Sequence, residues 1–175
     1  AGGEHPTAIP EYILKNCPEI DYIIRGEGEF SMLEFSYNKF FNKAVNNIPG
    51  ICFMNEENKF IDNGLSRRIE HIDKLPRPAW HLLKPKNYFT NAFTIGLAKG
   101  NLKNMPILAT RGCPYQCTFC SSPSMWTTRY IMRDPKEIVD EIEWLIKDYE
   151  ANDFEFFDLT AIIKKSWILE FCNEI

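Results

Sequence analysis

The segment from residue 105 to the end of the chain alternates between strand and helix patterns, and this order limits the folds open to it. Short apolar runs of strand type alternate with amphipathic helix patterns in the order 105–110, 135–149, 154–157 and 165–175. A further strand pattern, 93–98, comes before them across a turn at Gly100-Asn101. Two strands joined by a crossover helix nearly always lie parallel in one sheet. We therefore predict an α/β fold for this half of the chain.

The helix at 135–149 has the clearest boundary signals in the sequence. Asp134 suits the N-cap, Pro135 suits the first helical position, and Glu137 falls where a capping box needs it. Its apolar face consists of Ile138, Val139, Ile142, Leu145, Ile146 and Tyr149. The last helix is expected to turn Trp167, Ile168, Phe171 and Cys172 inward. Both helices therefore have one face suited to packing on a sheet.

The first half gives the order helix, strand, helix. We predict a helix at 7–16, a buried strand at 21–25, a tight turn at Gly26-Glu27-Gly28-Glu29 and a helix at 30–45. The second helix has a broad apolar stripe made of Phe30, Met32, Leu33, Tyr37, Phe40 and Phe41. Residues 51–54 and 59–61 are predicted to pair as a hairpin. This order is typical of the end of an open α/β sheet whose earlier strands are missing.

A proline-rich stretch, Leu75-Pro76-Arg77-Pro78-Ala79-Trp80, separates the two halves. Its prolines lack backbone donors and resist both helix and central strand. We place the domain boundary in or just before it. Residues 1–48 are then the end of one domain, 49–90 a linker region with a short hairpin, and 91–175 the start of a second domain.

Composition argues against two classes of partner. The formal net charge is −4, so no basic field favours nucleic acid. No apolar run approaches the ~20 residues of a transmembrane segment, and the first residues lack the basic and apolar regions of a signal peptide. The chain also begins without Met, and we expect it to be a piece of a longer protein.

Three of the six cysteines lie within eight residues, at Cys113, Cys117 and Cys120. The other three sit in apolar contexts and are interpreted as structural thiols: Cys17, Cys52 and Cys172. A disulfide framework spreads its cysteines through a short secreted chain. The clustered pattern instead favours a reducing cytosol and a local metal site.

Three closely spaced thiolates can hold one metal cluster without closing a long loop. Three thiolates bind three of the four irons of a cubane cluster, so the fourth iron keeps an open coordination position. An open position on a metal is typical of catalytic sites. Zinc and ferredoxin-type sites need a fourth ligand, while the histidines, 5, 71 and 81, are distant in sequence. The open cluster is the favoured interpretation, with a zinc site or unrelated thiols as alternatives.

The run Cys113-Pro114-Tyr115-Gln116-Cys117-Thr118-Phe119-Cys120 resembles the signature of the radical S-adenosylmethionine (SAM) superfamily, with Phe119 in its aromatic place. The resemblance implies that the three cysteines bind a [4Fe–4S] cluster whose open iron takes the amino and carboxylate groups of SAM. One electron then passes to the sulfonium, and cleavage yields a 5′-deoxyadenosyl radical. Phe119 is implied to lie against the adenine. Tyr115 and Ser121 are grouped with it as cofactor-contacting residues, although Ser121 and Ser122 are also of the type that simply ends a loop.

Further segments resemble the subgroup whose radical SAM domain follows a cobalamin-binding domain. Thr110–Tyr115 resembles the start of its cysteine motif, and Leu75–Pro78 resembles its interdomain stretch. The segment leading into its first barrel helix is matched by Arg129-Tyr130, Pro135 and Glu137–Glu141. The last two loops of its cobalamin domain are matched by Gly2–Pro6 and Asp21–Glu29. The resemblance implies the end of a Rossmann-like cobalamin domain followed by the first βα units of a partial TIM-type barrel. Gly2, Gly3, Gly26, Glu27 and Gly28 would then border cobalamin, and the turn at 26–28 its nucleotide tail. The other interpretation of that turn is a plain connection between strand and helix.

The sequence also departs from this subgroup. It lacks the Asp-x-His-x-x-Gly loop that supplies a histidine to cobalt, so His5 is a poor cobalt ligand. Family members often carry a second Asp after the one matching Asp158, where this chain has Leu159. Asp158 is interpreted either as facing SAM from the end of its strand or as a strand-end cap. No residue is assigned as a catalytic acid, base or nucleophile.

The resemblance implies radical methylation, rearrangement or cyclisation of an unreactive carbon in the whole protein. The substrate would be a small molecule or a lipid- or tetrapyrrole-like compound, and the electron donor a flavodoxin or ferredoxin. The isolated piece is expected to be inactive and prone to aggregate because an incomplete sheet leaves open edges. The rival interpretations are a non-catalytic iron–sulfur or zinc module that binds a partner, and a radical enzyme that has lost cobalamin.

Overall fold

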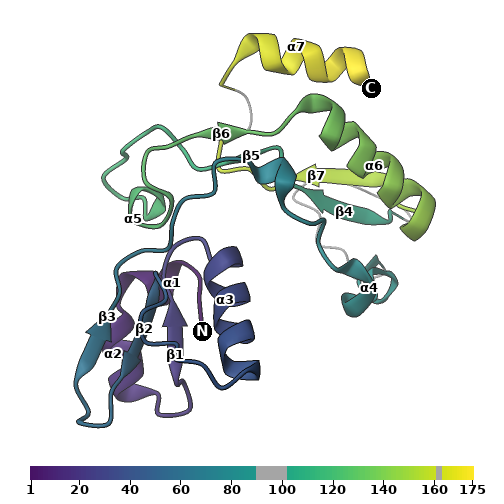
Figure 1. Cartoon of the computed structure of the whole chain (residues 1–175). Helices are drawn as coiled ribbons and strands as arrows, with labels where there is room; N and C mark the ends of the chain where they lie inside the picture. Colours follow the sequence, from purple (N-terminus) through teal and green to yellow (C-terminus); the bar gives the residue numbers. More distant parts are fainter. Residues whose placement is uncertain (90–101, 161–162) are drawn as a thin grey trace. The chain divides into compact units, whose positions relative to one another are not determined.

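The computed structural model describes residues 1–89, 102–160 and 163–175, which fall into two compact units (Figure 1). The first unit joins Ala1–Glu70 to Cys113–Arg129, and the second joins His71–Gly112 to Tyr130–Ile175. The cysteine segment is therefore part of the first unit, although it lies in the second half of the sequence. Within the described ranges, no helix has both the length and the apolar character needed to cross a bilayer.

A three-stranded antiparallel sheet forms the centre of the first unit. β1 (Tyr22–Ile24) pairs with β2 (Ile51–Met54), and β2 pairs with β3 (Phe60–Asp62). The pairing of β2 with β3 confirms the predicted hairpin. On the other side of β1, Gly2 forms a parallel bridge to Ile24. This bridge places the glycines near residue 2 beside the end of β1.

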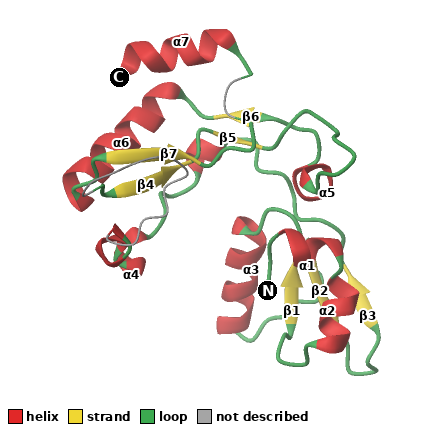
Figure 2. Cartoon of the chain, turned by 180° about the vertical axis from the view of Figure 1, so that it is seen from behind, coloured by secondary structure: helices red, strands yellow, loops and turns green. Residues whose placement is uncertain are grey.

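The predicted helix at 7–16 is two helices, α1 (Glu4–Ala8) and α2 (Pro10–Asn16). Pro10 stands at the first position of α2, where its missing N–H is tolerated, and it prevents α1 from continuing. The buried side chains of α2, Ile13 and Leu14, pack on Ile23 and Cys52. Since Ile23 and Cys52 are Cα partners in neighbouring strands, α2 covers one face of the sheet (Figure 2).

The other face is covered by α3 (Glu29–Phe40), through Phe35. The ring of Phe35 lies 4.9 Å from that of Tyr22 in an edge-to-face arrangement. The apolar stripe of this helix is exposed in the structure: Phe30 58%, Met32 52%, Leu33 67%, Tyr37 51%, Phe40 80% and Phe41 54%. A sheet of three short strands covers only the turn around Phe35. The helix also ends at Phe40 rather than at residue 45.

The second unit contains the parallel pair predicted from its element order. β4 (Asn104–Ile107) pairs in parallel with β7 (Asp153–Phe156), and α6 (Pro135–Tyr149) lies between them in the chain. α7 (Lys165–Glu174) follows. The core is made of Met105, Ile107, Ala109, Ile138, Leu145, Ala151, Trp167 and Phe171. The predicted α/β character is therefore confirmed, and the strand predicted at 93–98 lies outside the described residues.

The N-cap of α6 forms as predicted, whereas the backbone N–H of Asp134, which a capping box would pair with Glu137, donates to the Asp73 carboxylate at 2.9 Å. The helix spans the expected residues, and the Asp134 side chain accepts a hydrogen bond of 2.9 Å from the backbone N–H of Lys136. The prediction that Cys172 faces inward is wrong, because Cys172 is exposed, and Ile146 on the apolar face of α6 is 49% exposed. Both lie at the margin of an apolar stripe, where coverage depends on the neighbouring element.

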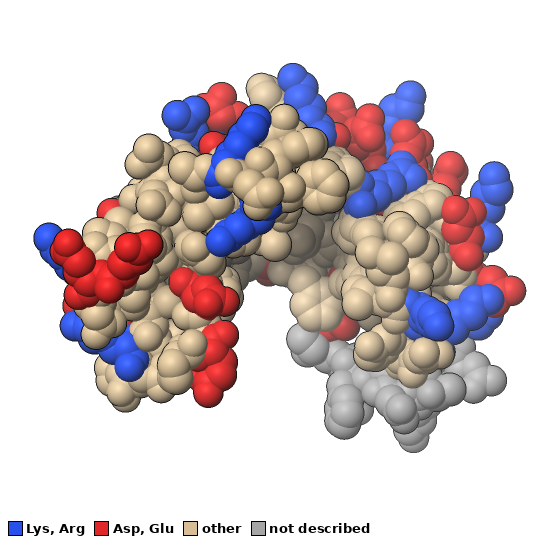
Figure 3. All heavy atoms as spheres, turned by 60° about the horizontal axis from the view of Figure 1, so that its bottom comes forward, with Lys and Arg blue, Asp and Glu red and all other residues tan. Residues whose placement is uncertain are grey.

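Short elements occupy the remaining connections. The proline-rich stretch lies between η1 (Ile72–Lys74) and α4 (Trp80–Leu83), and η2 (Pro85–Asn87) follows. β5 (Thr110–Arg111) pairs antiparallel with β6 (Ile131–Met132). Acidic and basic side chains are interspersed over the face drawn in Figure 3, in keeping with the small net charge of −4.

Candidate functional site

The cysteine segment runs from β5 to the short helix α5 (Ser122–Trp126). None of the three thiols is in a disulfide; Cys113 is half-buried, while Cys117 and Cys120 are exposed. Gly112, directly before the first cysteine, has a φ of 89°, which favours glycine. The backbone N–H of Cys120 donates to the carbonyl of Cys117 at 3.0 Å, so the last two cysteines share one tight turn.

A backbone donor already points at one of the sulfurs. The N–H of Ser122 lies 3.4 Å from the Sγ of Cys120. Such a hydrogen bond stabilises a thiolate and tunes a cluster that the thiolate holds. The start of α5 thus supports the last thiol of the segment.

The structure does not bring the three sulfurs together. Among the described residues, no group of three His, Cys, Asp or Glu side chains is close enough to hold a metal ion. The donor set nevertheless suits an iron–sulfur cluster, because it offers three cysteine thiols within eight residues, none of them in a disulfide and two of them exposed.

Two hydrogen bonds attach the segment after the cysteines to the first helix of the chain. The Ser121 hydroxyl donates to the Glu4 carboxylate at 2.7 Å. The Thr7 hydroxyl donates to the Sδ of Met125 at 3.4 Å, in a buried position. These contacts explain why the cysteine segment belongs to the first unit.

A cavity of about 810 Å³ lies within the same unit. All five residues predicted to border cobalamin line it, namely Gly2, Gly3, Gly26, Glu27 and Gly28. Gly3 and Gly26 have φ angles of 102° and 77°, which few other residues adopt. A Cβ added at Gly3 would meet no protein atom within 4 Å. The two glycine loops thus present backbone, rather than side chains, to one shared space.

Comparison with known proteins adds to this geometry. No protein-family model matches the chain. It is 33% identical to an anaerobic magnesium-protoporphyrin IX monomethyl ester cyclase from Rubrivivax gelatinosus, over 99% of this chain and 30% of the relative. It is 29% identical to an uncharacterized methyltransferase from Pyrococcus horikoshii, over 94% of this chain and 34% of the relative. The chain therefore spans about a third of the length of these curated relatives.

A solved structure matches almost the whole chain. The cobalamin-dependent SAM radical enzyme OxsB, with aqua-cobalamin and SAM bound, superimposes with a TM-score of 0.76 over 99% of this chain and 23% of that one, at 17% identity. The chain belongs to the cobalamin-binding subgroup of the radical SAM superfamily. The fold of this radical SAM segment is accordingly shared over both units, and the described residues contain no closed barrel.

Two aromatic residues predicted to contact cofactor are open to solvent in the radical SAM segment. Phe119 is 92% exposed and Tyr115 is 58% exposed. Large apolar side chains with this exposure suit contact with a ligand. Their contact with SAM stays a prediction, and so does that of Ser121, whose hydroxyl is engaged by Glu4.

Glu27 has a structural task at the edge of the cavity. It is 3% exposed, its carboxylate forms an ion pair with Arg68, and it accepts a hydrogen bond of 2.7 Å from the backbone N–H of Ile69. The carboxylate therefore ties the glycine turn to the chain after β3. Cobalamin contact by Glu27 stays a prediction, and the geometry favours contact through its backbone.

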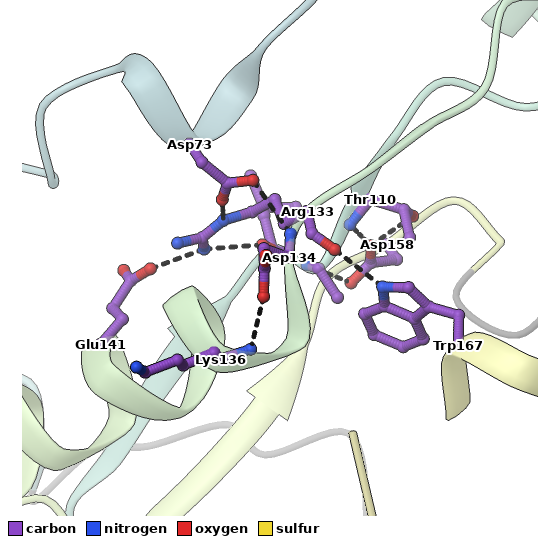
Figure 4. A network of polar contacts seen from close by, with 10 residues as sticks. Asp73, Thr110, Arg133, Asp134, Lys136, Glu141, Asp158 and Trp167 are labelled. Carbon is purple, nitrogen blue, oxygen red and sulfur yellow. Dashed lines mark hydrogen bonds and ion pairs between the residues drawn. The ribbon is translucent and has the colours of Figure 1, made fainter. Parts of the chain in front are cut away.

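Asp158, in the second unit, caps the end of the parallel pair (Figure 4). Its carboxylate accepts hydrogen bonds from the backbone N–H of Ala109, at 3.1 Å, and from both the N–H and the hydroxyl of Thr110. Of the two interpretations given to this residue, the strand-end cap is the one whose contacts are present. The carboxylate holds the backbone three residues before Cys113.

Arg133 anchors the same unit (Figure 4). Its guanidinium donates to Asp73 at 2.8 Å and to Glu141 at 2.6 Å. Burial by itself lowers the pKa of Arg133, but the hydrogen bonds and charges of these two carboxylates outweigh it and raise the pKa. The ion pairs tie α6 and η1 together beside the N-cap of α6.

Sequence reasoning missed four side chains of the cavity, Met32, Phe35, Met125 and Trp126. The first two lie in α3, where Met32 was assigned only to an apolar stripe and Phe35 was given no role. The other two lie in a loop without periodicity, and only the tertiary contacts of α5 reveal their position. Their proximity to the cysteine motif was the one available signal.

Proposed function

We propose that the whole protein is a radical SAM enzyme in which Cys113, Cys117 and Cys120 hold a [4Fe–4S] cluster whose fourth iron binds SAM. The observation that carries the proposal is a set of three cysteines within eight residues, none of them in a disulfide, in a chain of this superfamily. Three thiolates leave an open position, as catalytic metal sites do. When bound, the cluster would supply the electron that cleaves SAM reductively.

Cobalamin is the second cofactor of the proposal. The five residues predicted from the sequence line one cavity, and its glycines let a ligand approach the backbone closely. The related fold of OxsB holds aqua-cobalamin. Residues 1–48 would belong to the cobalamin domain, 49–90 to the linker region and 91–175 to the radical SAM domain. The first structural unit crosses this division in the sequence, since it includes Cys113–Arg129.

The residues of this chain would bind, orient and shield the cofactors. The thiolates would fix the cluster, the Ser122 N–H would support the Cys120 sulfur, and Phe119 would cover the adenine. Shielding is essential because a primary carbon radical can abstract hydrogen from C–H and S–H groups other than the substrate's. Tyr115 and Ser121 would complete this shield.

Methyl transfer to an unreactive carbon is the reaction proposed first, because the Pyrococcus relative is a methyltransferase. Radical cyclisation is the second candidate, because the Rubrivivax relative is a cyclase that matches 99% of the chain. The proposed substrate is a small molecule, and a tetrapyrrole-like one fits the cyclase relative. A flavodoxin or ferredoxin would supply electrons. Six cysteines, none of them in a disulfide, suit the reducing cytosol that such chemistry needs.

The test uses the full-length protein, reconstituted with iron and sulfide without oxygen. Wild type is expected to bind four irons, to give a reduced-cluster electron paramagnetic resonance signal that SAM alters, and to release 5′-deoxyadenosine. Cys113→Ala, Cys117→Ala and Cys120→Ala should each lose all three properties. Cys172→Ala is the matched control, because its thiol is exposed but lies outside the segment. The proposal would be refuted if any of these three cysteine variants kept the cluster, or if wild type bound one zinc and no iron.

Labelled SAM separates the two reactions. Transfer of a labelled methyl group to the product supports methylation. A product without label, formed together with 5′-deoxyadenosine, supports cyclisation or rearrangement. Wild type that binds no hydroxocobalamin would remove cobalamin from the proposal and leave the radical SAM assignment standing.

A further inference from the structure

One wall of the glycine-lined cavity comes from the turn that follows the cysteine motif. Met125 and Trp126, the last two residues of α5, line the cavity together with the loops at residues 2–3 and 26–28. α5 begins two residues after Cys120, at Ser122. The candidate cluster segment and the candidate cobalamin cavity are thus joined by one short helix.

Met125 shares an anchor with the glycine turn. The hydroxyl of Thr7 donates to the Sδ of Met125 at 3.4 Å and accepts from the backbone N–H of Gly26 at 3.2 Å. Thr7 is 2% exposed, so water has little access to its hydroxyl and does not readily replace either hydrogen bond. A movement of Met125 therefore disturbs the hydrogen bonding of the glycine turn.

Trp126 has a second link to that turn. The guanidinium of Arg68 lies 5.6 Å from the centre of the indole ring, in a cation–π contact. The same guanidinium forms the ion pair with buried Glu27. A chain of contacts thus runs from Trp126 through Arg68 to Glu27.

Two parts of the cavity lining differ in chemistry. The glycine loops at residues 2–3 and 26–28 supply backbone groups, whereas Met125 supplies a thioether and Trp126 an indole. Backbone N–H and carbonyl groups suit the amide-bearing rim of a corrin, and an indole and a thioether suit its flat ring. A flat ligand with a polar rim therefore matches both walls.

We propose that Trp126 and Met125 contact the corrin ring in this cavity, and that α5 thereby couples cobalamin binding to the order of the cysteine segment. This rests on the proposed function, because it takes cobalamin as the ligand. Ligand contact with α5 restrains the turn that ends the cysteine motif, and the Ser121–Glu4 hydrogen bond also holds this turn. Cobalamin would then pre-order the segment that receives the cluster.

Binding of hydroxocobalamin to the full-length protein tests the contact. Trp126→Ala should weaken binding about tenfold, as expected for loss of an aromatic contact, while Trp126→Phe should stay within about threefold of wild type. Phe40→Ala is the matched control, since that side chain is exposed in the same unit and does not line the cavity. It should bind like wild type. Equal binding by Trp126→Ala and wild type, at equal iron content, would overturn the proposed contact.

Hydrogen exchange tests the coupling in the wild-type protein, so this arm does not depend on any variant folding. Saturating hydroxocobalamin should slow amide exchange in the peptide covering residues 113–126 by about tenfold. This slowing is expected to be as large as the loss of binding in Trp126→Ala. Phe40→Ala should show the same slowing. Unchanged exchange in a wild type that binds hydroxocobalamin would overturn the coupling alone, whereas a wild type that binds none contradicts the cobalamin part of the proposed function.

Discussion

Asp158 accepts hydrogen bonds from both the backbone N–H and the side-chain hydroxyl of Thr110. The two residues are 48 positions apart in the chain. Through this contact the end of the second parallel strand fixes the backbone that leads to the cysteine segment. A carboxylate that holds two backbone donors and a hydroxyl is a cap with a clear structural task.

The first prediction concerns this cap. Asp158→Ala leaves the N–H groups of Ala109 and Thr110 without their acceptor, which should cost about 1–3 kcal/mol. Amide exchange at these two residues should rise strongly in the full-length variant, whereas Asp148→Ala, on the exposed side of α6, should have no such effect. If exchange at Ala109 and Thr110 is unchanged in Asp158→Ala, the cap is not holding this backbone.

The second prediction concerns the buried guanidinium of Arg133. Arg133→Met removes the partner of Asp73 and Glu141 and leaves the Glu141 carboxylate, whose side chain is 6% exposed, without its cation. The loss should be about 3 kcal/mol or more in the stability of the second unit. Urea unfolding of the full-length protein measures it.

The double variant Arg133→Met with Glu141→Leu serves as the control for that experiment. It removes the unpaired charge, so it should recover a large part of the stability lost in Arg133→Met. Equal stability of wild type and Arg133→Met would show that this ion pair contributes nothing to the unit.

The third prediction compares two free thiols. Burial, followed by the hydrogen bond to Asp62, raises the pKa of Cys52 to about 12. At pH 8 the thiolate is then on the order of one molecule in ten thousand, so iodoacetamide should barely modify Cys52. Cys172 is exposed and should be modified much faster. Peptide mass spectrometry gives both rates, and urea should remove the protection; comparable rates in the folded protein would contradict the burial of Cys52.

The fourth prediction concerns pH. Burial by itself raises the pKa of Asp62, but hydrogen bonds from Cys52, Gly64 and Arg25 outweigh it and lower the pKa. A carboxyl with a lower pKa in the folded chain stabilises it above the unfolded pKa of about 3.9. This stabilisation is lost as the pH falls through the folded pKa. Asp62→Asn should therefore cost more stability at pH 6 than at pH 3.

Amide exchange over residues 51–64 measures that cost locally, and Asp148→Asn is the exposed control. The contribution is modest because the Asp62 side chain is 35% exposed. An equal cost at both pH values would show that the Asp62 carboxylate gains nothing from its three donors.

Local signals were sufficient for part of the fold. α6 begins and ends where Asp134, Pro135 and its apolar positions predict, because caps and helical spacing act within a few residues. The side chains of α3 show the limit of such signals. Phe30, Leu33 and Phe40 have the right spacing for a buried face but are exposed, since burial depends on what lies opposite the helix.

The candidate site divides in the same way. The cysteine spacing and the glycine turns are short-range patterns, so the sequence revealed them, and the two glycine loops do meet at one cavity. Met125 and Trp126 carry no such pattern. Their place in the cavity comes from contact with α1, and the Thr7–Met125 hydrogen bond joins residues 118 positions apart.

The discontinuous first unit also constrains the order in which a ribosome-bound chain can acquire structure. Residues 1–70 emerge long before Cys113–Arg129, so the Thr7 hydroxyl and the turn at Gly26 must wait for their partner in α5. Closing so long a loop carries an entropic cost. The wall of the cavity is consequently completed only after residue 126 has left the exit tunnel, and cofactor loading before that point would find the nascent pocket open on one side.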